Sequence, residues 1–420
     1  MEYRFADRIN NLKPSAIREI LKNSDPNIIS LAAGNPAVES FPIAEMQEIA
    51  NKIFDENPGV AFQYGITEGY PKLRELLKKR LHDKFRMGSE NDDLIVVSGG
   101  QQAIDLATKV LCNEGDVVVS EDPAFIGALN TFRSYAVKLK GVPMEEDGMD
   151  TARLEQILKE TPNVKLLYTI PSFQNPLGIC TSLEKRKEVY RICVKYGVMI
   201  LEDNPYGELR FAGEDIPTLK SMDTEGIVIY CGSMSKVMSA GIRVGFVLAP
   251  KPVIAKMTVG KQASDVHTNQ FFQMLIAEYM ENYDFDAHIE KIRTIYRRKS
   301  GLMLETIEKY FPKEVGYTHP EGGLFLWCTL PEGADMLEFV KFAKEKGVSV
   351  VPGIAFNVEE DTPSRCFRIN YSTPSDEKVV EGTKILGLAL QEFLDSVYMR
   401  SSQNSQPNSD TPDMNSRKER

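Results

Sequence analysis

Residues 233–245 read Ser-Met-Ser-Lys-Val-Met-Ser-Ala-Gly-Ile-Arg-Val-Gly and form the most informative stretch of the chain. They follow the apolar run Ile227–Tyr230, which is typical of a buried strand. Lys236 therefore stands just past a strand end, flanked by Ser233 and Ser235 and followed seven residues later by Arg243. An amine in this setting can form a Schiff base with an aldehyde, while hydroxyl and guanidinium groups can hold a phosphate. Taken alone, the segment is better explained as a surface loop with a solvated lysine.

Two other strand ends carry polar residues suited to the same chemistry. Asp203 and Tyr206 follow the apolar run Val198–Glu202, and Asn175 follows the run Lys165–Thr169. The carboxyl ends of buried strands face the ligand crevice of an α/β sheet. If a pyridine ring with a phenolic oxygen binds in this crevice, Asp203 would keep the ring nitrogen protonated. Asn175 and Tyr206 could then donate hydrogen bonds to the phenolic oxygen. Each segment, read locally, is also an ordinary turn.

Three further features extend the pattern. The turn Ser98-Gly99-Gly100-Gln101 follows a strand and opens a helix, so its backbone N–H groups suit a phosphate. Phe125 could stack on an aromatic ring, although an isolated aromatic is more often a core residue. Arg368 lies inside the apolar run Cys366–Asn370, where its guanidinium needs a carboxylate from a ligand or from an internal Asp or Glu.

Composition excludes several functions. The 420 residues are 42% hydrophobic and 26% charged, enough to bury a large core. The net charge of −10 disfavours non-specific binding to nucleic acid. No run of the sequence approaches the roughly 20 apolar residues that a membrane span needs. The four histidines lie far apart, so we expect no metal site. Without a signal-like start, and with six scattered cysteines expected as reduced thiols, we expect a cytoplasmic protein.

Apolar runs alternate with amphipathic helical stretches such as Pro71–Phe85, which predicts a three-layer, doubly wound α/β fold with a mainly parallel sheet. After about residue 290 short strands and helices predict a smaller α+β domain. We expect an N-terminal segment (1–44) that packs with the small domain and covers the site. A large domain (45–290), the small domain (291–398) and a disordered tail (399–420) follow. The expected elements that lie outside the large domain are a helix at Ser15–Lys22, strands at Gly323–Cys328, Val348–Val351 and Cys366–Asn370, and helices at Ile292–Phe311, Asp335–Lys346 and Asp376–Val397.

Together, these segments in this order resemble fold-type I pyridoxal-phosphate enzymes, specifically the class I/II aminotransferases of the 2-aminoadipate/kynurenine aminotransferase-like branch. The resemblance covers nearly the whole chain. It implies pyridoxal 5′-phosphate as the cofactor and a homodimer with shared active sites.

The resemblance also implies a role for each matching residue. Lys236 is similar to the Schiff-base lysine and acid/base, Asp203 to the pyridinium partner, and Asn175 and Tyr206 to the donors at the ring oxygen. The catalytic group would be Lys236, Asp203 and Tyr206. The remaining cofactor contacts would be Gly100, Gln101, Phe125, Ser233, Ser235, Arg243 and, from the neighbouring subunit, Tyr64. Gly34, Asn175 and Arg368 resemble substrate-carboxylate contacts. Gly100 departs from the pattern, because many relatives have a hydroxyl residue there.

The resemblance implies transfer of the amino group of an aromatic, branched or 2-aminoadipate-like L-amino acid to a 2-oxo acid such as 2-oxoglutarate, by a ping-pong mechanism. A β-eliminating lyase on the same fold would use the same cofactor-holding residues. A regulator that senses the cofactor is a third reading. We rank it lowest, because Gly34 lies only 33 residues from the start and leaves no room for a DNA-binding domain ahead of it.

Overall fold

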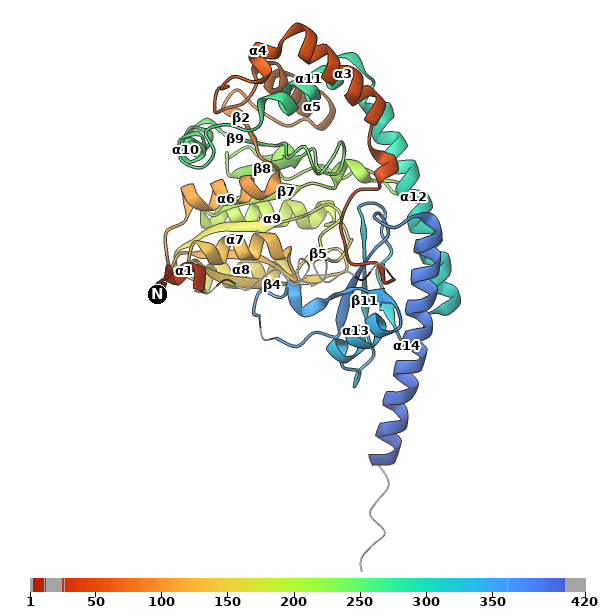
Figure 1. Cartoon of the computed structure of the whole chain (residues 1–420). Coiled ribbons are helices and arrows are strands. Elements are labelled where there is room, and N and C mark those ends of the chain that lie inside the picture. The colour runs from red at the N-terminus through yellow and green to blue at the C-terminus, as the bar shows by residue number, and fades with distance from the viewer. Residues whose placement is uncertain (1–2, 11, 13–24, 26, 361, 405–420) are drawn as a thin grey trace, which may run out of the picture.

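A central sheet of eight strands organises the molecule. The computed structural model describes residues 3–10, 12, 25, 27–360 and 362–404 (Figure 1). The strands are β2 (Asp92–Val97), β3 (Val117–Asp122), β4 (Lys138–Glu145), β5 (Gly148–Met149), β6 (Val164–Thr169), β7 (Met199–Asn204), β8 (Val228–Ser233) and β9 (Gly245–Pro250). Their order is β2-β9-β8-β7-β6-β3-β4-β5. Neighbours from β8 to β4 run parallel, whereas the pairs β2–β9, β9–β8 and β4–β5 are antiparallel. The mainly parallel α/β sheet is therefore confirmed.

Helices cover both faces of this sheet, giving three layers (Figure 1). The helices that pack on it are α6 (Gly100–Leu111), α7 (Ile126–Ser134), α8 (Thr151–Glu160), α9 (Leu183–Tyr196) and α10 (Lys251–Gln262). Along β3, Val118 joins the core under α6 and α7, whereas Val117 and Val119 join the core under α8 and α9. Because side chains alternate along a strand, a continuous apolar run serves both layers.

A group of helices lies beyond the β2 edge. They are α3 (Ile43–Glu56), α4 (Pro58–Ala61), α5 (Pro71–Phe85) and α11 (Gln270–Asn282), and the short α1 (Asp7–Asn10) contacts α7 instead. The structure has α5 at the predicted bounds. Leu73, Leu77 and Leu81 form its buried stripe, and Pro71 opens it, where a missing N–H costs nothing.

A second, four-stranded sheet lies in the C-terminal part of the chain, in the order β10-β11-β14-β13. The remaining strands are β1 (Ile29–Ser30), β10 (Gly316–Tyr317), β11 (Phe325–Thr329), β12 (Val348–Ser349), β13 (Val351–Pro352) and β14 (Cys366–Asn370). The remaining helices are α12 (Phe285–Tyr310), α13 (Met336–Glu345) and α14 (Asp376–Asn404), with the 3₁₀ turns η1 (Val38–Ser40), η2 (Gly207–Leu209), η3 (Lys220–Met222) and η4 (Gly353–Phe356). None of the described helices has both the length and the apolar character needed to cross a membrane.

Four expectations differ from the structure. The predicted strand Val348–Val351 is wrong as a single element, because β12 pairs with β1 while β13 pairs with β14. Helix α12 begins at Phe285 behind the N-cap Asp284, so it runs across the predicted domain boundary at residue 290. Helix α14 reaches Asn404 and takes in the start of the segment 399–420 predicted to be disordered. Strands β4 and β5 were not predicted: β4 lies towards the edge of the sheet, and its exposed lysines and Pro143 conceal its strand character.

The predicted helix Ser15–Lys22 lies outside the described residues.

Candidate active site

A cavity of about 300 Å³ opens where the carboxyl ends of β6, β7 and β8 approach the small sheet. Its walls come from both sheets and from the segment before η1. The lining residues are Gly34, Asn35, Gly100, Gln101, Ile104, Phe125, Ile170, Asn175, Asp203, Pro205, Tyr206, Ser233, Ser235, Lys236, Ala240, Arg243, Phe325 and Arg368. The position agrees with the rule that ligands of open α/β sheets bind beyond the carboxyl ends of the strands.

Lys236 lies three residues past the end of β8 and reaches into the cavity. Its Nζ donates a hydrogen bond to the backbone oxygen of Gly34 at 2.7 Å. Burial, together with the nearby Arg368 and Arg243 guanidinium groups, lowers the pKa of Lys236 to about 8. This lowered pKa brings the amine close to the neutral form that a nucleophile or a base requires. Gly34, which accepts the hydrogen bond, must be a glycine, because a Cβ there would lie 2.8 Å from the Phe325 ring.

Asp203 is 4% exposed and lies near the end of β7, facing the same cavity. Its Oδ2 accepts a hydrogen bond from the Tyr168 hydroxyl at 2.8 Å. Burial raises the pKa of Asp203 to about 6, and the hydrogen bonds from Tyr168 and Cys231 oppose that rise. A carboxylate kept in such a place is suited to a cationic ring nitrogen.

Several hydrogen-bond donors gather at the start of α6. Gly99 has a φ of 86°, and a Cβ there would lie 2.3 Å from Arg243 Nη2, so only glycine lets the guanidinium approach this turn. Arg243 donates to Ser98 O at 3.1 Å and to Ser235 Oγ at 3.3 Å. The first N–H groups of an α-helix have no partner within the helix, so those of α6 can bind an anion next to these donors. The Gln101 side chain is already used, because its Nε2 donates to Gly127 O, so its backbone is the part free for a ligand.

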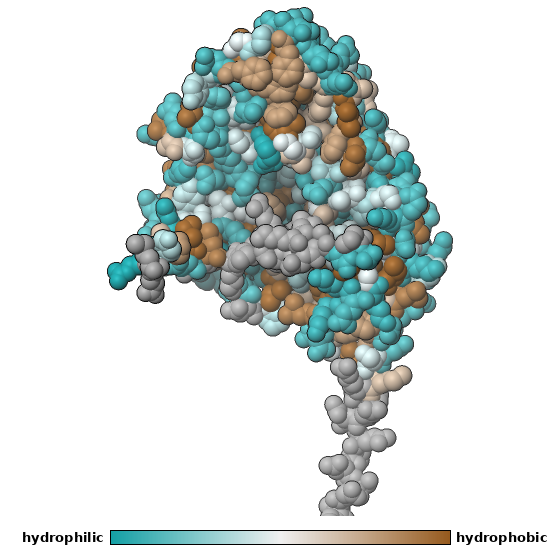
Figure 2. Space-filling view, viewed as in Figure 1, coloured by the Kyte–Doolittle hydropathy of each residue, from teal (hydrophilic) through white to brown (hydrophobic). Residues whose placement is uncertain are grey.

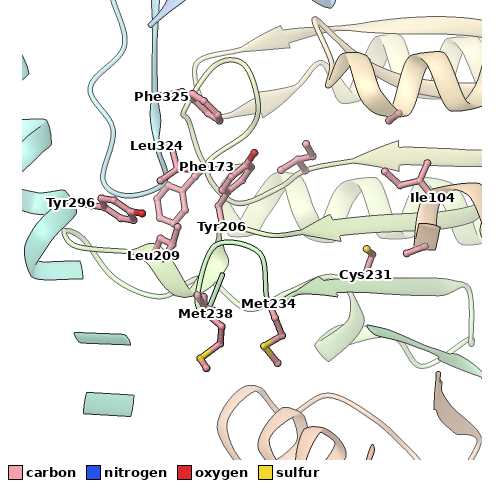
Figure 3. Packing of buried hydrophobic residues seen from close by; sticks show 14 of the residues in the cluster. Ile104, Phe173, Tyr206, Leu209, Cys231, Met234, Met238, Tyr296, Leu324 and Phe325 are labelled. Carbon is pink, nitrogen blue, oxygen red and sulfur yellow. The ribbon is translucent and has the colours of Figure 1, made fainter. Parts of the chain in front are cut away.

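Asn175, Tyr206 and Arg368 form a connected chain on the opposite wall. Arg368 Nη1 donates to Asn175 Oδ1 at 2.7 Å, and Asn175 Nδ2 donates to the Tyr206 hydroxyl at 3.3 Å. The Tyr206 ring meets Phe325 edge-on at 5.8 Å, and Figure 3 shows the two rings next to each other in the core. Burial raises the pKa of the Tyr206 phenol well above its usual value. The phenol therefore remains a donor.

Arg368 is 2% exposed, and its Nε has no hydrogen-bond partner. Its Nη2 donates to Ala32 O at 2.9 Å, and the rings of Phe325 and Phe356 lie 4.1 Å and 5.0 Å from its Cζ. Burial lowers its pKa to about 10, and within the described residues no Asp or Glu opposes that change. The internal ion pair considered from sequence is therefore absent from this part of the chain. A buried cation in this condition needs an anion.

Twelve of the thirteen residues singled out from sequence line this one cavity. The exception is Tyr64, which is 80% exposed on its own chain and packs edge-on against His267.

Sequence reasoning missed Phe325, Ile104, Ile170 and Tyr168. Each is an apolar or aromatic residue within or next to an ordinary apolar element, and no local pattern separates it from core.

The groups around the cavity fit pyridoxal phosphate. Four features surround one cavity: an amine with a lowered pKa, a buried carboxylate, a glycine turn held against an arginine, and a buried guanidinium whose Nε has no hydrogen-bond partner. These groups suit a pyridine aldehyde that carries a phosphate, together with the carboxylate of an α-amino acid.

The family model for aminotransferase class I and II matches residues 26–386, and the chain belongs to this family. It is a pyridoxal-phosphate-dependent aminotransferase.

Three similar proteins illustrate the relationship. Aromatic-amino-acid aminotransferase 1 of Thermococcus litoralis is 38% identical over 92% of this chain and 94% of its own length. The 2-aminoadipate transaminase of Thermus thermophilus is 38% identical over 93% of this chain and 97% of its own. The kynurenine aminotransferase of Pyrococcus horikoshii, solved in complex with PMP, KYN as substrates and KYA as products, has a TM-score of 0.88. It is 37% identical, over 92% of this chain and 97% of that one.

Proposed function

We propose that the cavity catalyses transfer of an amino group from an L-α-amino acid to a 2-oxo acid, with Lys236 as the proton carrier. The observation that carries this proposal is that the amine of Lys236 and the guanidinium of Arg368, whose Nε has no hydrogen-bond partner, line the same cavity. An α-amino acid presents an amino group and a carboxylate on the same carbon, so it needs both.

The chain would hold the cofactor at four points. Lys236 would attach to the aldehyde, and Asp203 would face the ring nitrogen. The Gly100–Gln101 turn with Ser233, Ser235 and Arg243 would bind the phosphate, while Phe125 would stack on the ring. When bound, pyridoxal phosphate supplies a ring that accepts electrons from the substrate Cα.

Lys236 and Asp203 would have complementary tasks. With a pKa lowered to about 8, Lys236 has the neutral form near physiological pH and can take and return the proton at the substrate Cα. Asp203, ionised above about pH 6, would hold the ring nitrogen in its protonated form. Tyr206 and Asn175 would donate hydrogen bonds to the phenolic oxygen.

The substrate carboxylate would bind to Arg368, with Asn175 and Gly34 beside it. Arg368 has the free donor, and the two phenylalanine rings fix the plane of its guanidinium. Ile104, Ile170, Phe125 and Phe325 give the cavity apolar walls.

We propose aromatic, branched or 2-aminoadipate-like amino donors and 2-oxoglutarate as the acceptor. The apolar walls support large side chains, and the related enzymes are named for aromatic amino acids, 2-aminoadipate and kynurenine. A panel of amino donors tested against 2-oxoglutarate ranks them.

The same panel separates transfer from elimination. A transferase forms one new amino acid per donor consumed and stops when the 2-oxo acid is exhausted. Continued release of ammonia without an acceptor would reject the proposal.

The attachment of the cofactor to Lys236 has its own test. Borohydride treatment of the loaded enzyme should link the cofactor irreversibly to the peptide that contains Lys236. Label on a different lysine would reject this role.

We further propose a homodimer in which Tyr64 reaches the phosphate of the neighbouring subunit. Its support is an apolar patch, made of Phe54, Val60, Phe62, Tyr64 and Ile66, which are 46–80% exposed. Figure 2 shows brown surface gathered at the end of the molecule where α3 and α4 lie. An exposed apolar patch of this kind marks an interface.

Mixing Tyr64→Phe and Lys236→Ala subunits tests the shared site. Each mixed dimer would contain one site with both changes and one with neither. The mixture should therefore recover activity that neither parent shows, provided that Tyr64→Phe alone is damaging. A fully active monomer would refute the proposal.

We also propose that the sheets act as two domains, 45–290 and 291–398, which share α12. We assign the N-terminal segment to the small domain. The pairing of Ile29 and Ser30 with β12 supports this assignment. For the compartment we propose the cytoplasm, supported by six cysteines that are all free thiols. Limited proteolysis and cell fractionation test these two assignments.

A further inference from the structure

Glu121 is a buried carboxylate next to the cavity with no role in the scheme above. It is 0% exposed and lies on β3, four residues before Phe125. Burial raises its pKa to about 7, with the nearby Asp203 adding to the rise and hydrogen bonds opposing it. A buried carboxylate without a basic partner is costly unless hydrogen bonds compensate for its lost hydration.

Within the described residues, the groups hydrogen-bonded to this carboxylate are a hydroxyl, a backbone N–H and a side-chain amide, and all of them donate. Oε1 accepts from the Thr169 hydroxyl at 2.5 Å and from Ile170 N at 3.1 Å. Oε2 accepts from Gln174 Nε2 at 3.0 Å. A carboxylate accepts at both oxygens, whereas an amide would turn its own N–H groups against one of these donors. The site therefore selects an acidic side chain.

Gln174 connects Glu121 to the substrate side of the cavity. It is 0% exposed, and its Nε2 also donates to Pro123 O at 2.8 Å. Its Oε1 accepts from Leu177 N at 2.9 Å. Gln174 thus ties the segment that leads to Phe125 to the loop that carries Asn175.

The next link is Asn175, whose Oδ1 accepts from Arg368 Nη1. Among the residues that the structure describes, the arginine has one other hydrogen-bonded contact, to Ala32 O. The orientation of its guanidinium therefore depends on where Asn175 lies.

We propose that Glu121 is a positioning residue for the substrate carboxylate: through Gln174 it holds Asn175, and through Asn175 it orients Arg368. This inference rests on the proposed function of Arg368 and adds a residue to it. Glu121 touches neither the substrate nor the cavity and acts through its neighbours alone.

Glu202 offers a matched control. It is also a 0% exposed carboxylate, at the end of the neighbouring strand β7. Its oxygens accept from the backbone N–H groups of Leu219 and Lys220, and it does not line the cavity. Glu202→Gln imposes the same loss of a buried charge without touching the path to Arg368.

The first measurement compares Glu121→Gln with Glu202→Gln in the loaded enzyme. Affinity for 3-phenylpropionate, a carboxylate without an amine, is followed by its effect on the cofactor absorbance. We expect Glu121→Gln to weaken this ligand and to raise KM for the amino donor, each by roughly tenfold or more, because small misplacements of orienting groups are costly. Cofactor affinity should not change. Glu202→Gln should lower the melting temperature and leave ligand affinity and KM at the wild-type values. Equal ligand affinity in the two variants would overturn the proposal.

A double-mutant cycle tests the route through Gln174. Gln174→Met keeps the length of the side chain and removes the amide, so it should weaken 3-phenylpropionate as Glu121→Gln does. If Glu121 acts through Gln174, the double variant should bind 3-phenylpropionate no more weakly than the single variant with the lower affinity. Additive losses, or a change confined to the cofactor spectrum, would instead mean that Glu121 acts on Asp203 and would reject the proposal. If Glu121→Gln does not fold, an unchanged KM in Gln174→Met alone overturns it. Absence of transaminase activity in the wild type would reject the proposed function instead.

Discussion

Arg186 and Arg368 are both buried arginines that form no salt bridge among the described residues, but their guanidinium groups are satisfied very differently. The carboxylate of Glu202 lies near Arg186 and favours its charge, whereas no Asp or Glu does this for Arg368. Arg186, on α9, uses all three nitrogens. Nε donates to Thr181 O, Nη1 to Pro217 O, and Nη2 to Pro171 O and Ser172 Oγ. Arg368 leaves Nε without a partner and faces the cavity. Burial of an arginine therefore does not identify a ligand site, whereas a buried arginine that lines a cavity and keeps one donor without a partner is a candidate for one.

The largest effect should come from Arg186→Ala. The substitution removes the donors of at least four buried or half-buried acceptors and leaves a cavity. We therefore expect the free energy of unfolding to fall by about 4 kcal/mol or more. Chemical denaturation measures this loss. The folded fraction should keep kcat/KM close to wild type. A stable variant with poor kcat/KM would mean that Arg186, too, serves the site.

Arg368→Ala should show the reverse pattern. Losing a charge-assisted contact to the substrate carboxylate should lower kcat/KM by roughly 10- to 150-fold, equivalent to about 1.5–3 kcal/mol. The melting temperature should fall far less than in Arg186→Ala, because no buried carboxylate is stranded. Thermal unfolding and kinetics on one sample decide between the roles. A large drop in melting temperature with unchanged specific activity would remove Arg368 from the substrate site.

The third effect is a shift along the pH axis. Attachment of the cofactor to Lys236 needs the neutral amine, so its rate in cofactor-free enzyme should rise with pH and level off above about pH 8. Arg368 helps to lower this pKa, so Arg368→Ala should raise the pKa and move the curve to higher pH. Arg186→Ala should leave the curve in place. The absorbance change after mixing with pyridoxal phosphate gives the rates. Superimposable curves for wild type and Arg368→Ala would contradict the electrostatic coupling.

The smallest effect concerns Gly100. A Cβ there would lie 3.5 Å from Cys231 Sγ and 3.8 Å from Asp203 Oδ1, which is ordinary contact. Gly100→Ser should therefore fold normally and gain about 0.5 kcal/mol of helix stability. The added hydroxyl at the phosphate turn should keep or tighten cofactor affinity. Equilibrium dialysis measures this affinity. Weaker binding would mean that the turn does not lie against the phosphate. By contrast, Gly99→Ala should disturb Arg243, which a Cβ would meet at 2.3 Å.

Much of the fold was predictable because the strands are buried on both faces. The strands predicted at Lys165–Thr169, Val198–Glu202 and Ile227–Tyr230 all occur within a few residues of the expected bounds. Elements that depend on distant partners were not predictable. Val348–Val351 divides between two sheets only because Ile29 and Ser30 supply a partner for β12. The start of helix α12 was missed for a different reason: it is marked by the N-cap Asp284 and not by a change in the apolar pattern.

The site was predictable where function places polar residues at strand ends, as for Lys236, Asp203 and Asn175. It was not predictable where the chemistry depends on ordinary core residues. Phe325 lies under Arg368 and beside Tyr206, yet its sequence surroundings are those of any apolar strand. Glu121 could not be recognised from its local sequence, because it is linked to Arg368 only through Gln174 and Asn175, which lie far from it in the chain.

The central claim is that Arg368 binds the carboxylate of the amino donor. The most direct test uses the amino acid that the enzyme consumes fastest and the carboxamide of that amino acid, which lacks the charge. The preference for acid over amide, measured as a ratio of kcat/KM in the half-reaction, should be large in the wild type. In Arg368→Ala this ratio should fall by roughly 10- to 150-fold, whereas in the folded fraction of Arg186→Ala it should keep the wild-type value. An acid-to-amide ratio that is the same in wild type and Arg368→Ala would contradict the account.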